Sequence, residues 1–261
     1  MVTKIIVAQI RSLLPDLLSP LQSAFVLGSH GVDNSIIVQK LIHSMARKKG
    51  RGGVMAIKLD LEKAYDCLEW SFISDTLNLY KFPSRLISLI ISCLSSSSIS
   101  ILVNGRALES FYPSRGIRQG DPLSPYLFIL CMEVLGALIE EKCKAKLWNS
   151  IKASQGGSEF SHVFFANDLM LFAKADRKNC LAIRELLDSF CELSGQKISN
   201  EKSRVYSSPN VAPDKRTELS EILGFCSIPN IGKYLDFPIK HSGIPQDFGH
   251  ILDRIKSKLA G

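Results

Sequence analysis

The sequence lacks the marks of a membrane-spanning, secreted or zinc-binding chain. Its seven cysteines form no Cys-x-x-Cys pair, and their odd number and scattered spacing favour reduced thiols in an intracellular compartment. No small-residue cleavage site follows the first 18 residues, so a secretory signal is not expected. The most apolar stretch, residues 123–139, contains Pro125 and Glu133, which favours a buried helix and predicts no membrane association.

Internal repeats and long low-complexity tracts are also missing. The apolar share of 46% and the charged share of 22% are typical of a globular chain and exclude disordered and fibrous classes. Lys and Arg number 32 against 25 Asp and Glu, a net charge of +7, which permits a polyanionic partner without requiring one. Basic groups at residues 47–51 and 254–258 could follow a nucleic-acid backbone or form a solvated charged face.

Helix and strand patterns alternate irregularly along the chain. Apolar side chains recur at helical spacing over residues 2–14, 35–48, 71–80, 84–94, 121–144 and 176–194, and a basic helix is expected at 248–259. Apolar runs of strand length cover residues 54–61, 99–103, 107–112, 162–165, 169–173, 204–207 and 233–239. Asn104-Gly105 predicts a hairpin turn, and Asp121-Pro122 predicts the start of the long helix. This order favours an α+β fold with a mostly antiparallel sheet.

Two aspartates stand beside strongly apolar segments. Asp60 ends a predicted strand, and Asp168 lies in the turn of a predicted hairpin. A carboxylate in such surroundings is costly unless it is paired, hydrogen-bonded or metal-bound. Delivered from adjacent strands, the two could hold divalent cations that activate an attacking oxygen and stabilise a leaving oxygen at phosphorus. The alternative is that each aspartate caps a helix or fixes a turn.

A glycine-rich basic segment precedes the predicted long helix. Residues 115–125 read Arg-Gly-Ile-Arg-Gln-Gly-Asp-Pro-Leu-Ser-Pro. Backbone amides and the positive end of a helix dipole can receive a phosphate, glycine permits its close approach, and arginine adds bidentate contacts. The alternative is an ordinary loop before a capped helix.

Together these segments resemble a known family. Residues 56–66, Ala-Ile-Lys-Leu-Asp-Leu-Glu-Lys-Ala-Tyr-Asp, resemble the first catalytic motif of reverse transcriptases from non-LTR retrotransposons (long interspersed elements), the plant type in particular. Residues 115–125 match that family's Arg-Gly-x-Arg-Gln-Gly-Asp-Pro-Leu-Ser-Pro box in full. Residues 163–168 stand where the family has Phe-Ala-Asp-Asp, and residues 22–26, 194–203 and 233–235 resemble its fingers motif, the segment after the catalytic hairpin and the primer-gripping turn.

The resemblance implies a right-hand polymerase fold with an antiparallel palm sheet packed on helices. Residues 1–53 and 71–114 would form the fingers, 54–70 and 115–240 the palm, and 241–261 the start of a thumb that is otherwise mostly absent. The implied activity is RNA-directed DNA synthesis, in which deoxynucleoside triphosphates extend a DNA primer on an RNA template with two magnesium ions. The resemblance also implies a nuclear location.

The catalytic roles implied by the resemblance fall on four residues. Asp60 would coordinate both magnesium ions, and Asp168 and Asn167 would stand at the remaining ligand positions. Lys202 would protonate the pyrophosphate leaving group, with a merely solvated lysine as the alternative.

The substrate-binding roles fall on five others. Leu61 would border the nucleotide, and Tyr65 would lie under its sugar and reject a 2′-hydroxyl, with simple core packing as the alternative. Gln119 and Gly120 would line the pocket for the incoming nucleotide and template base. Arg118 would contact phosphate or template, with a surface ion pair as the alternative.

The departures from the family pattern carry equal weight. Asn167 replaces the aspartate that is the family's metal ligand, and Asp168 is its less critical partner. An asparagine carbonyl can coordinate magnesium but brings no negative charge, so the site would lose transition-state stabilisation on the order of several kcal/mol. Since about 1.4 kcal/mol corresponds to a tenfold change in rate, the reaction could slow by several orders of magnitude. Ser29 stands where the family has arginine, and Asp236 replaces a glycine whose backbone geometry aspartate is expected to fit poorly. The chain also begins inside a helix of the fingers and ends where the thumb would continue.

Three functions therefore remain open. The first is a polymerase impaired by Asn167. The second is a truncated, degenerate remnant without turnover, in which Asn167→Asp alone would restore little activity. The third is a nucleic-acid-binding module that holds RNA in the polymerase groove without magnesium. The departures favour the remnant for this molecule and the polymerase for its domain type. An unrelated phosphohydrolase has only the two aspartates in its favour.

Overall fold

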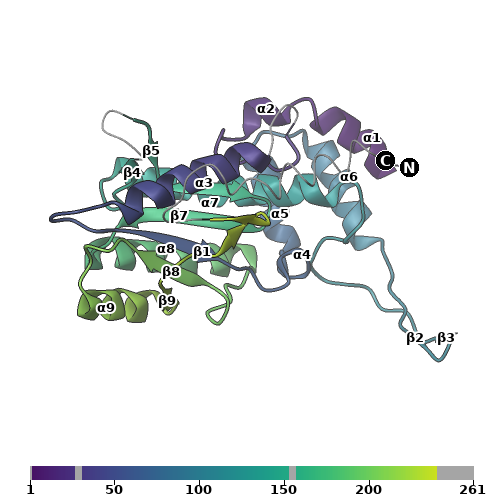
Figure 1. Cartoon of the computed structure of the whole chain (residues 1–261). Helices are drawn as coiled ribbons and strands as arrows, with labels where there is room; N and C mark the ends of the chain where they lie inside the picture. The colour runs from purple at the N-terminus through teal and green to yellow at the C-terminus, as the bar shows by residue number, and fades with distance from the viewer. Residues whose placement is uncertain (1, 27–30, 153–156, 240–261) are drawn as a thin grey trace, which may run out of the picture.

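The protein is described by a computed structural model that covers residues 2–26, 31–152 and 157–239 (Figure 1). A five-stranded sheet lies at its centre in the order β6-β7-β1-β8-β9. These strands are β6 (His162–Phe165), β7 (Asp168–Lys174), β1 (Val54–Leu59), β8 (Arg204–Ser207) and β9 (Cys226–Ile228). All neighbours pair antiparallel except β8 and β9, which are parallel. The predicted α+β class with a mostly antiparallel sheet is confirmed.

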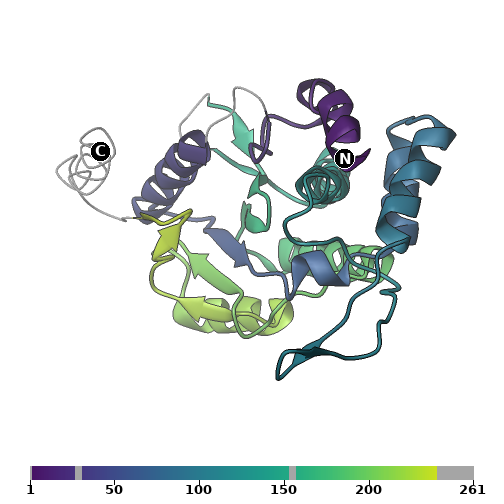
Figure 2. The same ribbon diagram turned by 90° about the vertical axis from the view of Figure 1, so that its right-hand side faces the viewer.

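Helices cover both faces of the sheet. The helices of the described residues are α1 (Val2–Ile10), α2 (Leu14–Leu17), α3 (Gly31–Ala46), α4 (Ala64–Cys67), α5 (Trp70–Leu79), α6 (Ser84–Ser95), α7 (Ser124–Lys144), α8 (Arg177–Ser194) and α9 (Pro213–Leu223). Figure 2 shows α3 on one side of the sheet and α7 with α8 on the other. No helix in the described ranges is long and apolar enough to cross a membrane.

Alternation along the strands divides the core into two clusters. On β1, Ile57 and Leu59 join the larger cluster, which includes residues of α5, α7 and α8. Ala56 of the same strand joins Met170 and the α3 residues in the smaller cluster. Successive strand residues point to opposite faces, so both faces of β1 are covered and the strand reads as a continuous apolar run.

Three short ladders stand apart from the central sheet. They pair β2 (Leu102–Val103) with β3 (Arg106–Ala107), β4 (Ile151–Lys152) with β5 (Glu159–Phe160), and β10 (Lys233–Tyr234) with β11 (Phe237–Pro238). The predicted hairpin around Asn104-Gly105 forms, but its ladder is shorter than predicted and projects from the body (Figure 1). Farther from the turn, the two predicted strands meet again only at the isolated antiparallel bridge between Ile99 and Phe111. The ladder residues are exposed on both faces, with Leu102 71% exposed, so no buried face supports a longer regular ladder.

Several predicted element boundaries are wrong. The N-terminal helix ends at Ile10 rather than continuing toward Pro15, which lies in α2. The long helix begins at Ser124, not at Asp121, whose Oδ1 instead accepts the Leu123 N–H at 2.8 Å. The turn at residues 121–123 thus uses the aspartate before the helix starts. The predicted basic helix at 248–259 lies outside the described residues.

Candidate active site

Asp60 and Asp168 meet at the ends of two neighbouring strands. The antiparallel register of β1 and β7 runs from Val54↔Lys174 to Leu59↔Leu169, and the two aspartates come directly after that last pair. Asp168 shares a sheet face with Met170, and Asp60 shares that face with Lys58, which pairs with Met170. Two carboxylates more than a hundred residues apart in sequence are therefore neighbours on one face.

The carboxylate of Asp168 is in an unfavourable electrostatic position. Partial burial is the main cause that raises its pKa above the ordinary value, and the negative charges of Asp60 and Asp236 raise it further. The ammonium of Lys58 acts in the opposite direction. Lys58 Nζ also donates to the Lys233 carbonyl at 2.8 Å, which ties β1 to β10. An additional cation at this place would relieve the repulsion between the carboxylates.

A cavity of about 520 Å³ opens on this side of the hairpin. Lys58, Asp168 and Asp236 line it, together with Phe165 and Leu235. Asp236 has a φ of 63° and thus adopts the left-handed backbone geometry that we expected an aspartate to fit poorly. That expectation is wrong because aspartate tolerates this region better than most side chains.

The backbone of Asp60 is fixed by the segment that precedes β8. Its N–H donates to Ser203 Oγ at 3.1 Å, and its carbonyl accepts the Ser199 N–H at 2.9 Å. Lys202 lies in this same turn, where its N–H donates to Ser199 Oγ at 3.3 Å and its side chain is exposed. Lys202 is thus held next to the strand end that carries Asp60.

Asn167 occupies the turn between β6 and β7, where it is exposed. The register closes with Phe165↔Asp168, so Asp168 belongs to the strand and only Ala166 and Asn167 form the turn. Beneath the turn lies the buried side chain of Gln22, whose Oε1 accepts the Ala166 N–H at 3.4 Å. A segment far upstream therefore supports the hairpin.

A second cavity, of about 610 Å³, contains most of the predicted substrate-binding residues. Leu61, Tyr65, Gln119, Gly120 and Asn167 line it together. These residues come from three separate segments of the chain. Asn167 therefore faces this cavity, whereas Asp168, its neighbour in sequence, lines the cavity beside Lys58.

Arg118 lies apart from this group. It lines a neighbouring cavity of about 460 Å³ together with Arg115, Gln119 and Asp121. Gln119 and Asp121 border both spaces, so Arg118 stands one step outside the cavity that holds Tyr65.

The ring of Tyr65 is held rigidly. It stacks on Phe128 of α7 with a centroid distance of 4.9 Å and an interplanar angle of 10°. Its carbonyl accepts the Ile117 N–H at 2.8 Å, which binds the 115–121 loop to the helix that carries Tyr65. Burial raises the pKa of the Tyr65 hydroxyl, so the side chain presents a neutral phenol.

Glycine at position 116 is required by a close backbone approach. Its N–H donates to the Leu68 carbonyl at 2.8 Å, and its carbonyl accepts the Trp70 Nε1–H at 2.7 Å. The residue has a φ of 85°, and a Cβ there would lie 2.8 Å from the Asp66 carbonyl oxygen. No other residue type fits without a shift of one of the two segments.

The donor atoms near the strand ends are few. Among the described residues no group of three His, Cys, Asp or Glu side chains is placed to hold a metal ion. Asp60 and Asp168 supply two carboxylates, and Asn167, next to Asp168 in sequence, supplies an uncharged amide on the side of the cavity that holds Tyr65. Sequence reasoning missed Lys58 and Gln22, although both lie inside the segments that carried the resemblance.

Comparisons with known proteins show which family the chain belongs to. The family model of reverse transcriptase (RNA-dependent DNA polymerase) matches residues 1–234. The Pol polyprotein of the R2DM type-2 retrotransposable element of Drosophila melanogaster is 32% identical over 70% of this chain, which spans 16% of that protein. An uncharacterized 149 kDa protein of transposon TX1 from Xenopus laevis is 29% identical over 54% of the chain and 11% of its own length. An uncharacterized mitochondrial protein of Arabidopsis thaliana is 45% identical over 26% of the chain and 55% of its own length.

Solved structures show the same fold. Telomerase from Candida albicans, in complex with a TWJ fragment of telomeric RNA, matches 81% of this chain and 34% of its own with a TM-score of 0.53 at 13% identity. Apo telomerase from Candida tropicalis, truncated from its C-terminal domain, matches 81% of this chain and 40% of its own with a TM-score of 0.51 at 14% identity. With the family match over residues 1–234, these findings show that the chain belongs to the reverse transcriptase (RNA-dependent DNA polymerase) family.

Proposed function

We propose that the chain is the polymerase domain of a non-LTR retrotransposon of the plant type, and that it extends a DNA primer on an RNA template with deoxynucleoside triphosphates. One observation carries this proposal. Asp60 and Asp168 lie side by side at the strand ends, and a cavity lined by Leu61, Tyr65 and Gln119 opens next to them. Acidic groups beside a nucleotide-sized cavity are what a phosphoryl-transfer site requires. The resemblance extends the proposal to a nuclear site of action.

In this proposal the central sheet and the loop at 115–121 form the palm, within residues 54–70 and 115–240. Residues 1–53 and 71–114 form the fingers. The thumb would begin at 241–261. This segment lies outside the described residues, and so do Ser29 and the basic residues at 254–258. The exposed β2–β3 hairpin, which projects from the body, suits a fingers element that reaches toward a template.

The residues at the strand ends fit magnesium in part. Magnesium is usually held by one or two carboxylates, with substrate phosphates and waters completing its shell. Asp60 and Asp168 supply that pair. Burial is the main cause that raises the pKa of Asp168, and a bound cation would relieve the smaller contribution from the negative charges of Asp60 and Asp236. When bound, magnesium would polarise the phosphate and stabilise the developing charge. A second ion would need the carboxylate that is missing at Asn167.

The chain's own side chains would orient the nucleotide. Tyr65, rigid against Phe128, would form the wall under the sugar and leave no room for a 2′-hydroxyl. Gln119 and Gly120 would border the base, with Leu61 on the opposite segment. Arg118, in the adjoining cavity, would contact template or phosphate from outside.

Lys202 and Asn167 would determine how fast the reaction proceeds. The exposed ammonium of Lys202, held in the turn beside Asp60, is the group we assign to the protonation of pyrophosphate. We expect Asn167 to slow turnover, because its amide lacks the negative charge that an aspartate would bring to the site. The same observation favours a second candidate, a remnant that keeps the fold without turnover.

Primer extension on an RNA template with magnesium or manganese tests the proposal. We expect slow extension by the unaltered chain that Asp60→Ala abolishes. Extension no higher than that of Asp60→Ala would favour the remnant.

A further inference from the structure

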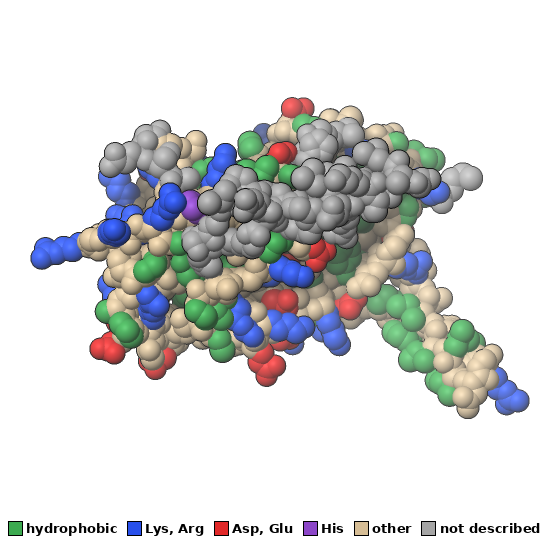
Figure 3. All heavy atoms as spheres, viewed as in Figure 1, with side chains coloured by type: hydrophobic (Ala, Val, Ile, Leu, Met, Phe, Trp, Pro, Cys, Tyr) green, Lys and Arg blue, Asp and Glu red, His purple; other side chains and the backbone are tan. Residues whose placement is uncertain are grey.

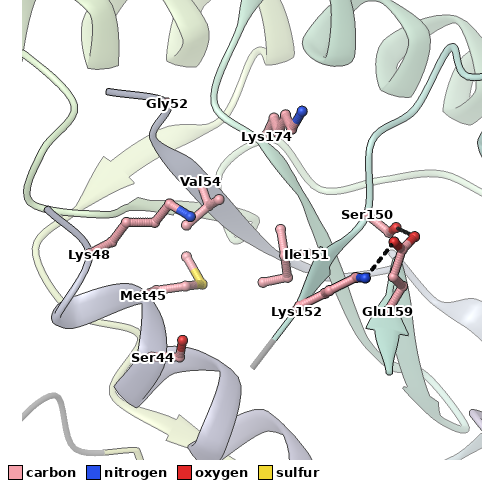
Figure 4. A pocket seen from close by; sticks show the side chains of 10 residues that line it. All are labelled: Ser44, Met45, Lys48, Gly52, Val54, Ser150, Ile151, Lys152, Glu159 and Lys174. Atoms are coloured by element: carbon pink, nitrogen blue, oxygen red, sulfur yellow. Dashed lines mark hydrogen bonds and ion pairs between the residues drawn. The ribbon is translucent and has the colours of Figure 1, made fainter. Parts of the chain in front are cut away.

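A basic pocket lies at the other end of the two strands that carry the aspartates. It has a volume of about 460 Å³ (Figure 4). Three lysines line it from three elements: Lys48 follows α3, Lys152 belongs to β4, and Lys174 ends β7. The hydroxyl-bearing residues Ser44 and Ser150 line the same pocket.

Only one of the three ammonium groups is neutralised. Lys152 pairs with Glu159 at 3.3 Å, and the same carboxylate accepts the Ser150 hydroxyl at 2.6 Å. Within the described ranges, no hydrogen bond or ion pair engages the ammonium of Lys48 or of Lys174. Glu159 also lies within electrostatic reach of Lys174, but the pocket holds three lysines against this one carboxylate and therefore carries a net positive charge.

The surface next to the pocket is also basic. Arg47, Lys49 and Arg51 belong to the exposed or partly exposed loop between α3 and β1, next to Lys48. Figure 3 shows Lys and Arg side chains gathered at this end of the molecule. A partner that used both the pocket and the loop would carry negative charges at repeated intervals, as a nucleic-acid backbone does.

The pocket is separate from the strand ends that carry Asp60. β7 runs for seven residues from Asp168 to Lys174. At about 3.3 Å per residue, the strand places about 20 Å between its two ends. A nucleotide bound at the aspartates would not reach Lys174.

We propose that this pocket binds a phosphate of a nucleic-acid backbone, at a site distinct from the polymerase cavity. Lysine is a compact charge with rotatable donors, so it binds phosphate without reading bases. The site would anchor a strand at a distance from the strand ends where synthesis takes place. It does not depend on the proposed polymerase activity.

The test measures binding in the absence of divalent ions. A labelled single-stranded 20-nucleotide RNA and the DNA of the same sequence are titrated with the full chain in EDTA at 0.1 M KCl, and anisotropy is read. We compare the native chain with Lys48→Gln/Lys174→Gln, and with the matched pair Lys4→Gln/Arg85→Gln, exposed residues of α1 and α6. The charge-preserving pair Lys48→Arg/Lys174→Arg separates loss of charge from loss of fold.

The expected results follow from counterion release. Each phosphate contact contributes about 0.7 to the slope of log K against log salt, or about fivefold at 0.1 M, so the glutamine pair should lose about 20-fold and the arginine pair little. The nucleic acid that shows the loss, RNA or DNA, identifies the backbone that is bound. A loss below threefold, or an equal loss in the Lys4/Arg85 pair or in the arginine pair, would overturn the proposal. Primer extension at saturating template should be unchanged, which keeps this test independent of the polymerase site.

Discussion

Asp60 and Asp168 occupy facing positions one step beyond the pair Leu59↔Leu169 of adjacent antiparallel strands. Neither residue depends on a mobile connection, because Asp60 is held by Ser199 and Ser203 and Asp168 lies within β7. The acidic pair is therefore a fixed property of the central sheet. The residue next to this pair in sequence, Asn167, is the one that departs from the family pattern.

Tyr65 is predicted to control the choice of sugar. Tyr65→Ala removes the ring that stacks on Phe128 and opens the cavity floor, so the ratio of ribonucleotide to deoxynucleotide incorporation should rise at least about tenfold. Single-nucleotide extension in the Asn167→Asp chain measures the ratio. Tyr65→Phe keeps the ring and should leave the ratio near its original value. An unchanged ratio in Tyr65→Ala would show that the tyrosine only packs.

Gly116→Ala is predicted to loosen the loop at 115–121. The added Cβ would meet the Asp66 carbonyl oxygen at 2.8 Å, at a φ of 85°. We expect a loss of about 2–4 kcal/mol in the free energy of unfolding, measured by urea denaturation.

Gly105→Ala is the matched control. This glycine also has a positive φ, of 76°, but a Cβ there would meet no atom within 4 Å. Its expected cost is about 1 kcal/mol, from conformation alone. Equal losses in the two variants would contradict a special role for the approach between Gly116 and Asp66.

Glu133 is predicted to make stability fall as pH rises. Burial raises its pKa from 4.5 to about 7, although its Oε1 accepts the Ser19 N–H at 3.0 Å. Between pH 4.5 and 7 the folded state binds more protons than the unfolded state, so the free energy of unfolding decreases across this window. Glu133→Gln keeps the acceptor without the charge and should be more stable than the native chain at pH 8, by on the order of 2 kcal/mol.

Urea denaturation at pH 5 and pH 8 checks this prediction. The difference between native and variant isolates Glu133 from other groups, including buried His162, whose pKa is lowered to about 4 by burial. Glu141→Gln, exposed on the same helix, should show no such difference. A Glu133→Gln advantage that is the same at both pH values would refute the assignment.

Metal affinity is predicted to depend on position 167. Asn167→Asp adds a negative charge beside the acidic pair, so magnesium affinity should rise at least about tenfold, and Asp60→Asn should lower it. Isothermal titration calorimetry measures both. Asp188→Asn, a surface residue paired with Arg184, is the control and should leave affinity unchanged. A lack of response at both Asn167 and Asp60 would rule out the proposed ion site.

The fold was largely predictable where one buried face dominates. The apolar runs of β1 and β7 and the stripe of α8, with Asp176 accepting the Asn179 N–H and Gly195 ending the helix, gave correct elements. α9 was not predicted, because only Leu219 and Leu223 of its eleven residues are buried and its periodic signal is weak. The parallel pairing of β9 with β8 depends on contacts that no local pattern encodes.

The candidate site was predictable as a set of residues but not as a geometry. Spacing alone left Asp60 and Asp168 as either metal ligands or turn residues, and the resemblance supplied the pairing. The division between Asn167, which lines the cavity beside Tyr65, and Asp168, which lines the cavity beside Lys58, follows from the strand register. The contact of Lys58 with Lys233 spans 175 residues and leaves no local signal.

The central claim is that a polymerase site is assembled here and lacks one carboxylate. Primer extension on an RNA template with magnesium tests it directly, with the native chain, Asn167→Asp, Asp60→Ala and the double variant compared side by side. We expect Asn167→Asp to extend the primer at least about a hundredfold faster than the native chain, and Asp60→Ala to abolish extension in both backgrounds. Extension by Asn167→Asp that is no faster than extension by the double variant would contradict the account.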